Sequence, residues 1–470
     1  MMDRILCFLI FLITRLAGFS KPLSRLRPGS YDEWKPGRKI KILLAGYNGA
    51  RNTGSDARVA AIARQVKDVF GADNVQITVM TLDADSLAGY FDDDVCLLPF
   101  SSIFPVDLFR ACCTHHAVIL CEGSTLKSTF ANALTLFLCE AAGVMGAQKK
   151  PCIAYGSEIG KMEPFLQRAA RYFCRDTYFI PRSHESFTAM KALGFKGHEG
   201  TDAAWLYDGA ISSARADEIL EQSGWDHKKP LLGIAVIDPF CWPVRSSLPK
   251  WIRTLVTGNR AGQYDKWYYF SDSAKRRSAY RRYIREMAKT VNYMAENRGF
   301  YPVLIGMERL DEKACRDLRA GLRTPSAMFL SGYCSADIMT GILRRLSVLV
   351  TSRYHAAVLS MEHACPITAV SMDERLDGLM HELSLDADHL FHVTDPDLGR
   401  KICRSLADAM KGRRAIEERI RKQYAKDRET LQEMGSFMRT YIQERLGVLA
   451  EPRTVRKHLP LCAAAIRRRL

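Results

Sequence analysis

Short apolar runs alternate with longer segments in which apolar residues recur at helical spacing, from residue 39 to residue 397. Such alternation is typical of parallel sheets whose strands are connected by helices. Predicted strands fall at 40–45, 75–80, 95–98, 117–120, 151–155 and 177–180, and, after a polar stretch at 217–230, at 231–237, 301–305, 327–330, 347–351 and 366–370. The pattern predicts an α/β protein with two Rossmann-like, doubly wound domains, at 39–225 and 226–397, that face each other across a cleft.

The two ends of the chain differ from this alternating core. Residues 398–446 repeat apolar positions at helical spacing, so we expect C-terminal helices that pack across both domains, with a basic tail to residue 470. Residues 5–13 are almost wholly apolar but too few for a helix that crosses a bilayer. Arg4 is partly offset by Asp3, and no good cleavage site follows. We predict an uncleaved membrane-associating segment at 1–30; the alternative is a cleaved signal peptide or a start-site artefact.

Positive charge is concentrated at these ends. The formal net charge is +16, and residues 1–39 (eight Lys and Arg, three Asp and Glu) and 446–470 (six and one) contribute +5 each. Basic tails bind nucleic acid or anionic membrane surfaces. The sequence has no nucleic-acid-binding module, zinc-finger spacing or repeat of aromatic and basic residues. We therefore expect an anionic membrane partner, no nucleic acid, and a cytoplasmic protein held peripherally or monotopically at the inner face of the plasma membrane.

The fourteen cysteines include no CxxC pair, and most lie in apolar runs. Buried free thiols in a reducing compartment explain this usage best. The run Cys112-Cys113-Thr114-His115-His116 superficially suggests a metal site, but adjacent cysteines suit a single metal ion poorly. We predict that this run enters the core before the strand at 117–120, and we expect no metal.

Charged side chains follow two neighbouring predicted strands in the second domain. Arg353 and His355 come after one strand, and Arg375 comes after the next. The carboxyl ends of parallel strands share one edge of a sheet, and helix N-termini at that edge favour anions. We therefore expect an anion site. The alternative is that these arginines are surface residues that cap helices and pair with Asp373 or Glu374.

A loop rich in glycine and asparagine, 46–56, precedes a predicted helix at 57–69. Glycines allow the backbone to approach a ligand closely, and Ser55 or Asp56 is a candidate N-cap of the helix. The spacing matches neither a phosphate-binding P-loop nor a dinucleotide-binding fingerprint. The loop is therefore a candidate site of another kind.

An insertion at 240–285 is rich in Arg, Lys and aromatic residues, including Trp242, Trp251, Trp267, Tyr268 and Tyr269. Aromatic side chains beside cations suit a membrane interface or a glycan acceptor. A solvated loop above a basic helix explains the pattern equally well.

Several motifs, in a fixed order between residues 39 and 392, resemble the polysaccharide pyruvyl transferase family. They are Gly46-Tyr47-Asn48-Gly49-Ala50-Arg51-Asn52-Thr53-Gly54-Ser55-Asp56, Tyr155-Gly156-Ser157-Glu158-Ile159-Gly160, Arg182-Ser183-His184-Glu185-Ser186, Leu193-Gly194-Phe195, Asp202 and Arg353-Tyr354-His355-Ala356. The resemblance implies a two-domain, glycosyltransferase-B-like (GT-B-like) fold. It also implies transfer of a pyruvyl group from phosphoenolpyruvate, as a ketal, to a sugar of a cell-surface polysaccharide or a lipid-linked glycan precursor.

The resemblance, with the chemistry of the side chains, assigns expected roles. The residues expected to bind the donor are Arg182, Arg353, His355 and Arg375. The expected catalytic residues are His355, Arg353 and Asp202. Those expected on the acceptor side or in its loop are Asn48, Asn52, Asp56 and Glu122. Arginines grip a carboxylate or phosphate with two N–H groups, and an imidazole can donate and accept a proton near neutral pH. We expect no cofactor and no metal, because phosphoenolpyruvate enters as a co-substrate.

Two departures from the family pattern leave other functions open. Glu122 stands where the family often has a run of glycines, and Arg375 replaces the lysine of an Asp-x-Lys motif. Arg keeps the charge but does not give up its proton as Lys can, and Glu122 could repel phosphoenolpyruvate. One alternative is a GT-B-type glycosyltransferase that uses a nucleotide sugar, with Glu362 near the donor ribose. The other is a catalytically inactive polysaccharide-assembly protein.

Overall fold

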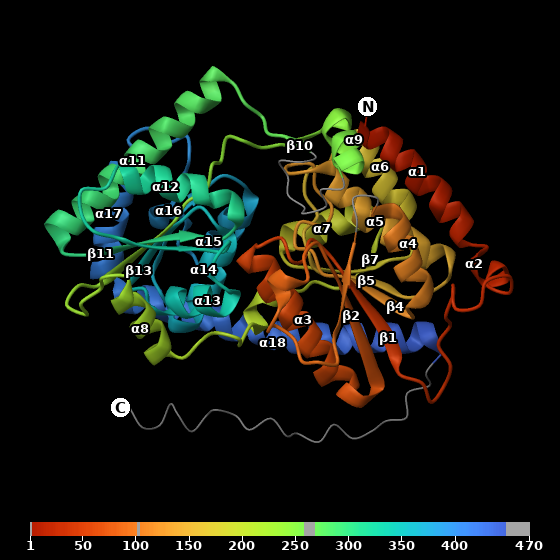
Figure 1. Cartoon of the computed structure of the whole chain (residues 1–470). Coiled ribbons are helices and arrows are strands. Elements are labelled where there is room, and N and C mark those ends of the chain that lie inside the picture. The colour runs from red at the N-terminus through yellow and green to blue at the C-terminus, as the bar shows by residue number, and fades with distance from the viewer. Residues whose placement is uncertain (1, 101–103, 258–267, 448–470) are drawn as a thin grey trace.

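The computed structural model describes residues 2–100, 104–257 and 268–447, and two parallel sheets organise them (Figure 1). The first sheet has the strand order β3-β2-β1-β4-β5-β6-β7 and the second has the order β12-β11-β8-β13-β14-β15. The strands of the first sheet are β1 (Ile40–Ala45), β2 (Val75–Thr81), β3 (Cys96–Pro99), β4 (Ala117–Leu120), β5 (Cys152–Ser157), β6 (Tyr178–Pro181) and β7 (Lys196–Gly197). Those of the second are β8 (Leu231–Ala235), β11 (Tyr301–Gly306), β12 (Ala327–Leu330), β13 (Val348–Thr351), β14 (Ile367–Ser371) and β15 (Leu390–His392).

All eleven predicted strands are present, with ends at most two residues from the predicted positions. The apolar pattern missed β7 and β15, which are the edge strands at one end of each sheet. It also missed an antiparallel ribbon in the insertion, formed by β9 (Arg245–Ser246) and β10 (Tyr268–Tyr269). Each of these strands has two or three residues, too few for an alternation of buried and exposed positions to be recognised.

Helices cover both faces of the first sheet. One face packs against α3 (Thr53–Phe70), and the other against α4 (Phe104–Thr114), α5 (Asn132–Ala147) and α6 (Pro164–Phe173). Within β1, Ile42 and Leu44 face the first layer while Leu43 and Ala45 face the second. Burial on both faces explains why this strand is apolar at nearly every position.

The second sheet is covered in the same way. Its outer face packs against α11 (Ala274–Arg298), α12 (Glu312–Ala320) and α17 (Leu398–Lys411), and its inner face against α13 (Ala336–Arg345) and α14 (Tyr354–Ser360). Further helices in the described residues are α2 (Ser20–Leu23), α7 (His184–Ala192), α8 (Ser213–Gln222), α9 (Leu248–Thr257), α15 (Glu374–Glu382) and α16 (Asp386–His389).

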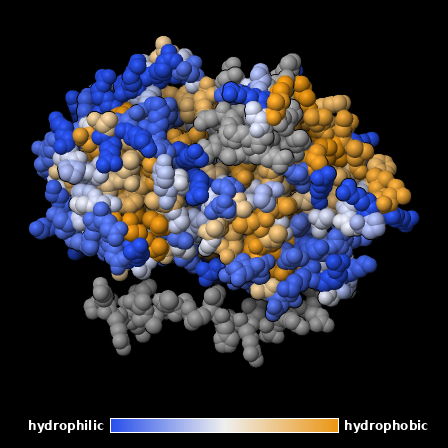
Figure 2. Space-filling view, viewed as in Figure 1, coloured by the Kyte–Doolittle hydropathy of each residue, from blue (hydrophilic) through white to orange (hydrophobic). Residues whose placement is uncertain are grey.

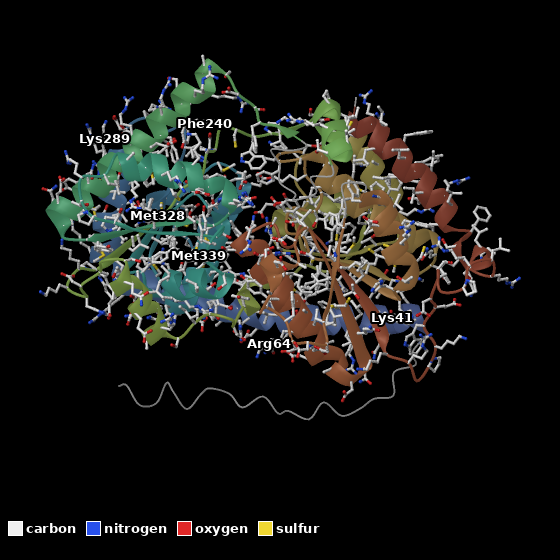
Figure 3. The ribbon with its side chains drawn as sticks, in the orientation of Figure 1. Lys41, Arg64, Phe240, Lys289, Met328 and Met339 are labelled. Carbon is white, nitrogen blue, oxygen red and sulfur yellow. The ribbon has the colours of Figure 1, made fainter. Side chains whose placement is uncertain are left out.

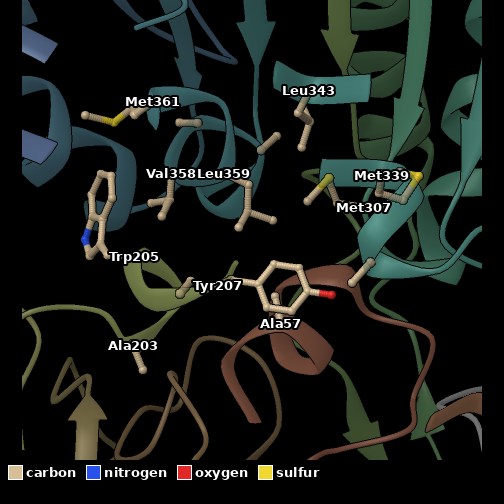
Figure 4. Packing of buried hydrophobic residues seen from close by; sticks show 14 of the residues in the cluster. Ala57, Ala203, Trp205, Tyr207, Met307, Met339, Leu343, Val358, Leu359 and Met361 are labelled. Carbon is tan, nitrogen blue, oxygen red and sulfur yellow. The ribbon is translucent and has the colours of Figure 1, made fainter. Parts of the chain in front are cut away.

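A single hydrophobic cluster runs from one domain into the other. Ala57 and Trp205 of the first domain pack in the same cluster as Met339, Leu343 and Val358 of the second (Figure 4). Met339 accordingly lies near the middle of the molecule rather than at its edge (Figure 3). Removal of this apolar surface from water favours association of the domains. The architecture is therefore a two-domain α/β fold of the GT-B type with a shared core.

The last helix, α18 (Arg413–Leu446), lies across both domains, as the C-terminal pattern predicted (Figure 1). Near its start Arg413 donates a hydrogen bond to the carbonyl of Ser347 in the second domain at 3.2 Å. Farther along, Asp427 accepts a hydrogen bond from Thr201 of the first domain at 2.6 Å. The helix therefore links the two domains.

The N-terminal segment forms a helix, α1 (Met2–Ala17), that packs along α5. Ile10, Thr14 and Ala17 are buried in this contact. A Cβ on Gly143 of α5 would lie 2.9 Å from both Thr14 and Phe173, so the glycine permits the close approach of the helices. Among the described residues no helix is long and apolar enough to cross a membrane.

We expect Gly143→Val to destabilise the protein by about 1–3 kcal/mol, because the added methyl groups overpack the contact between α1 and α5. The free energy of unfolding in urea measures this effect. Gly378→Val is the matched control, since a Cβ at that helical glycine would have no neighbour closer than 3.9 Å. Equal stability of the two variants would contradict the close packing of α1.

Candidate functional site

A cavity lies between the domains, where strands of both sheets end. It is lined by Tyr47, Asn52, Ser55, Arg58, Glu122, Gly123, Ser124, Phe130, Leu134, Arg182, Trp242, Met307, Glu308, Arg353, Tyr354, His355 and Arg375. These residues follow β1, β4, β6, β8, β11, β13 and β14. Ligands of open α/β sheets bind outside the carboxyl ends of the strands, so this interdomain cavity is the candidate site.

Six of the residues predicted from the sequence line the interdomain cavity: Asn52, Glu122, Arg182, Arg353, His355 and Arg375. Strands β13 and β14 are direct neighbours, so the expectation that Arg353, His355 and Arg375 lie at adjacent strand ends is confirmed. Asp202 lies behind the wall in contact with lining residues. Asn48 lies in the loop after β1, and Asp56 lies in the first turn of α3.

Asp202 is fully buried and contacts three side chains of the cavity wall. Its Oδ1 lies 2.5 Å from Nη1 of Arg58, and its Oδ2 accepts a hydrogen bond from Nη1 of Arg182 at 2.9 Å. Oδ2 also lies 3.7 Å from Nε2 of His355. Burial by itself would raise the pKa of Asp202, but Arg58, His355 and Arg182 hold it well below its usual range. A buried carboxylate in this state keeps both arginines in place.

Glu158 connects two further cations. Its Oε2 accepts a hydrogen bond from Nη2 of Arg182 at 2.5 Å, and its Oε1 accepts one from Nζ of Lys127 at 2.7 Å. Lys127 is also 3.0 Å from Glu374 of the second domain. Burial opposes ionisation of Glu158, yet Arg182 and Lys127 lower its pKa. A chain of alternating charges therefore crosses from one domain to the other behind the cavity.

Arg353 is held by two acids that follow β11. Its Nε donates to Oδ2 of Asp311 at 2.8 Å, and its Nη2 donates to Oε2 of Glu308 at 2.9 Å. Burial raises the pKa of Asp311 to about 6, although the contact with Arg353 opposes this shift. We did not predict either acid from the sequence. Both follow a predicted strand just as Arg353 does, which is the signal that could have revealed them.

Arg375 pairs with Asp373, as the alternative interpretation expected, but the pair is not at the surface. Nη2 of Arg375 donates to Oδ2 of Asp373 at 2.6 Å, and the guanidinium lies 4.8 Å from the ring centroid of Phe130. Glu374 instead contacts Lys127. Arg375 lines the cavity, so pairing with a neighbouring acid and a place in the site are compatible.

His355 is largely but not fully buried in the cavity wall, with 17% of its side chain exposed, and it is neutral near pH 7. Burial lowers the pKa of His355 to about 4, against the opposing effect of Asp202. Among the described residues Nε2 has no hydrogen-bond partner, because 3.7 Å is too long for a hydrogen bond to Asp202. The ring also packs against the start of α3, where a Cβ on Gly54 would lie 2.0 Å from Nδ1. His355 therefore brings a neutral imidazole to the cavity wall, with Nε2 beside Asp202 and Nδ1 beside α3.

The loop after β1 is held by a polar side chain of its own and by one from the first turn of α3. Asn48 donates a hydrogen bond to a backbone carbonyl of β2 at 3.0 Å, and Asp56 accepts one from a backbone N–H of the loop at 3.4 Å. Burial raises the pKa of Asp56 to about 7. The prediction that Ser55 or Asp56 caps the helix is wrong. The N-cap is Asn52, which accepts a hydrogen bond from the backbone of Ser55 at 3.2 Å, so α3 begins four residues earlier than predicted.

Some residues that line the cavity were not predicted from the sequence. Arg58 is a cation on the buried side of α3, and its position among apolar residues is a signal for a buried ion pair. Tyr354 lies under Arg182, with the guanidinium 4.9 Å from its ring centroid. Phe130 packs edge-on against Trp242 at 5.0 Å between centroids. No periodicity marks Phe130, because its place in the wall depends on how the loop after β4 folds.

Trp242 is the residue of the aromatic insertion that the structure brings to the cavity. Trp267, the side chains of Trp251, Tyr268 and Tyr269, and the basic tail at 448–470 lie outside the described part of the chain. The two alternatives for these residues therefore stay predictions.

Two further candidates lie away from the cavity. Glu362 pairs with Arg344 and does not line the cavity. It is therefore not where the glycosyltransferase alternative expected it, beside the ribose of a nucleotide-sugar donor. Cys112 and Cys113 are buried, as the core interpretation predicted. Within residues 2–100, 104–257 and 268–447, no group of three or more His, Cys, Asp or Glu is arranged to hold a metal ion.

The low pKa of His355 makes stability depend on pH. Between about pH 6.5 and pH 4 the unfolded imidazole binds a proton that the folded one does not, so stability falls as the pH falls through this range. The unfolding free energy of the wild type should decrease on going from pH 7 to pH 5. We expect this decrease to be smaller by about 2 kcal/mol in His355→Asn, because the variant has no imidazole to protonate. Urea denaturation at both pH values measures it.

His381→Asn is the control for this prediction. His381 is exposed, and its hydrogen bond with Asp386 raises its pKa instead of lowering it. Loss of His381 should therefore not reduce the fall in stability between pH 7 and pH 5, and should if anything enlarge it slightly. If His355→Asn does not reduce this fall either, His355 is not a buried neutral imidazole.

Comparisons with known proteins bear on the family and on the fold. The family model described as polysaccharide pyruvyl transferase matches residues 52–374. Among solved structures, S. aureus MnaA with UDP superposes with a TM-score of 0.53 at 8% identity, covering 81% of this chain and 90% of that one. Anabaena Alr3699/HepE in complex with UDP-glucose superposes with a TM-score of 0.52 at 12% identity, covering 87% and 99%. No curated protein matches the sequence. The structural likeness concerns the fold, whereas the family model spans more than half of the sequence, so the chain belongs to the polysaccharide pyruvyl transferase family.

Proposed function

We propose that this protein transfers the pyruvyl group of phosphoenolpyruvate, as a ketal, to a sugar of a cell-surface polysaccharide or of its lipid-linked precursor. We place the reaction at the inner face of the plasma membrane. The observation that carries the proposal is the convergence of Arg182, Arg353, Arg375 and His355 on one cavity in a member of this family.

The arginines suit a small donor with a carboxylate and a phosphate. Arg353 and Arg375 use Nε and Nη2 in their ion pairs, and among the described residues Nη1 of each has no partner. These N–H groups can bind an anion without breaking the existing pairs. Because Asp311, Glu308 and Asp373 fix the guanidinium groups, the donor would meet an array that is already oriented.

His355 is the proposed proton donor. Burial keeps it neutral, but the negative charges of bound phosphoenolpyruvate would raise its pKa and favour uptake of a proton. The protonated ring would then protonate the methylene carbon of the donor. One sugar hydroxyl adds to the resulting cationic carbon, inorganic phosphate leaves, and a second hydroxyl closes the ketal. Each hydroxyl loses its proton in the process.

Isothermal titration calorimetry tests the donor. We expect phosphoenolpyruvate to bind the wild-type protein and Arg353→Ala to weaken binding at least tenfold, by about 1.5–3 kcal/mol, because a charged hydrogen bond is lost. His355→Gln should keep binding and lose turnover. Arg309→Ala, a change at an exposed arginine near the same strand end, is the control and should bind as the wild type does.

The other outcomes separate the alternatives. Binding of a nucleotide sugar in place of phosphoenolpyruvate would contradict the proposed donor and favour glycosyl transfer. In that case Glu362 would not contact the donor, because it pairs with Arg344 outside the cavity. Tight binding of phosphoenolpyruvate with no turnover on any glycan tested would favour an assembly protein without catalysis. Because Arg353→Ala leaves two buried acids unpaired, folding is checked for each variant by its thermal transition.

Glu122 is the proposed base on the acceptor side. Its carboxylate accepts hydrogen bonds from the backbone N–H groups of Tyr47 and Ser124, each at 3.3 Å. The other lining carboxylate, Glu308, is occupied by Arg353. A carboxylate held by backbone donors and free of a paired arginine or lysine among the described residues can accept the proton of a sugar hydroxyl.

We expect Glu122→Gln to lower kcat about a hundredfold and to leave the Kd for phosphoenolpyruvate within a factor of about two, because the change removes a base and not a donor contact. Single-turnover kinetics and calorimetry measure the two quantities. The opposite result, much tighter donor binding with unchanged kcat, would mean that Glu122 excludes anions and takes no part in proton transfer.

A further inference from the structure

Exposed apolar side chains are concentrated at the N-terminus. Of the fifteen large apolar side chains that are exposed in the described part of the chain, nine belong to residues 5–26. Phe8 and Leu16 are each 59% exposed, Phe19 is 61% exposed and Leu26 is 84% exposed. We call the exposed apolar side chains of residues 5–26 the N-terminal apolar face. The space-filling view shows hydrophobic residues gathered where α1 lies in Figure 1 (Figure 2).

The N-terminal apolar face is opposite to the face by which α1 contacts the protein. Ile10, Thr14 and Ala17 pack against the first domain, whereas Phe8, Leu12 and Leu16 are spaced four residues apart on the other side. A helix that is apolar on all sides requires an apolar environment on all sides. Because one face is docked on α5, the other stays in a fixed orientation on the surface.

Exposed cations lie within and beside the N-terminal apolar face. Arg15 and Arg25 are exposed within residues 5–26, and the exposed Arg27 follows directly. Helix α6 adds the exposed Arg168 and Arg171, and its Tyr172 packs on Phe11 of α1 with ring centroids 5.5 Å apart. Apolar side chains bordered by Lys and Arg are the composition of helices that lie in the plane of a membrane with anionic lipids.

We propose that the N-terminal apolar face docks on a lipid bilayer, with the surrounding arginines in contact with anionic headgroups. In this arrangement α1 lies in the plane of the interface and does not cross the bilayer. A second copy of the chain fits this face less well, since a two-fold interface would bring the same cations of both copies together. The inference deepens the proposed location at the membrane, on which it rests, and it needs no assumption about the donor.

The test is co-sedimentation of the full chain with vesicles of phosphatidylcholine and phosphatidylglycerol. We expect the triple variant Phe8→Gln, Leu12→Gln, Leu16→Gln to lose at least about tenfold in partitioning, because three apolar side chains no longer enter the lipid. Substitution on the exposed side is preferable to deletion of α1, since deletion would uncover the apolar surface of α5. The matched control changes three exposed apolar residues of the second domain, Tyr293→Gln, Tyr333→Gln and Met410→Gln.

Charge is tested separately with Arg15→Gln, Arg25→Gln, Arg27→Gln, which should weaken binding to vesicles that contain phosphatidylglycerol more than to vesicles of phosphatidylcholine alone. Equal sedimentation of the wild type and the triple apolar variant would overturn the proposal. A wild-type dimer that the apolar variant converts to a monomer, with no vesicle binding, would assign the face to a second copy. Sedimentation does not depend on turnover, so failure here is distinct from failure of pyruvyl transfer.

Discussion

The buried charge of Asp202 is the constraint on which the rest of the site depends. A carboxylate without exposure to water is strongly destabilising unless cations and hydrogen bonds compensate it. Arg58 of α3 and Arg182 after β6 supply this compensation, and His355 of the second domain lies beside the same carboxylate. One acid therefore fixes two cavity arginines and places its negative charge beside the proposed proton donor, although it does not line the cavity itself.

The same principle extends across the cleft. Arg353 is oriented by Glu308 and Asp311, and Arg375 by Asp373, so each lining arginine has an acid behind it. The shared hydrophobic cluster and α18 hold the two halves of this charge network together. A site of paired charges is rigid and selects ligands by the direction of its remaining N–H groups as well as by charge.

The two departures from the family pattern, Glu122 and Arg375, are both in the cavity wall. Arg375 keeps a positive charge and gains an aromatic partner, Phe130, under its planar guanidinium. Glu122 brings a carboxylate to a position held by backbone N–H groups. Because both residues line the same cavity, a change at either position bears directly on a ligand bound there.

The sequence by itself determined the two sheets and the edge at which the site lies. Apolar runs mark buried strands, and parallel strands end at a common edge, so Arg353, His355 and Arg375 were expected together. The tertiary structure decided their partners. Arg353 follows β13 and its acids follow β11, two strands that are brought near each other only because both pair with β8. Strand order depends on packing over the whole domain, so it cannot be predicted from local periodicity.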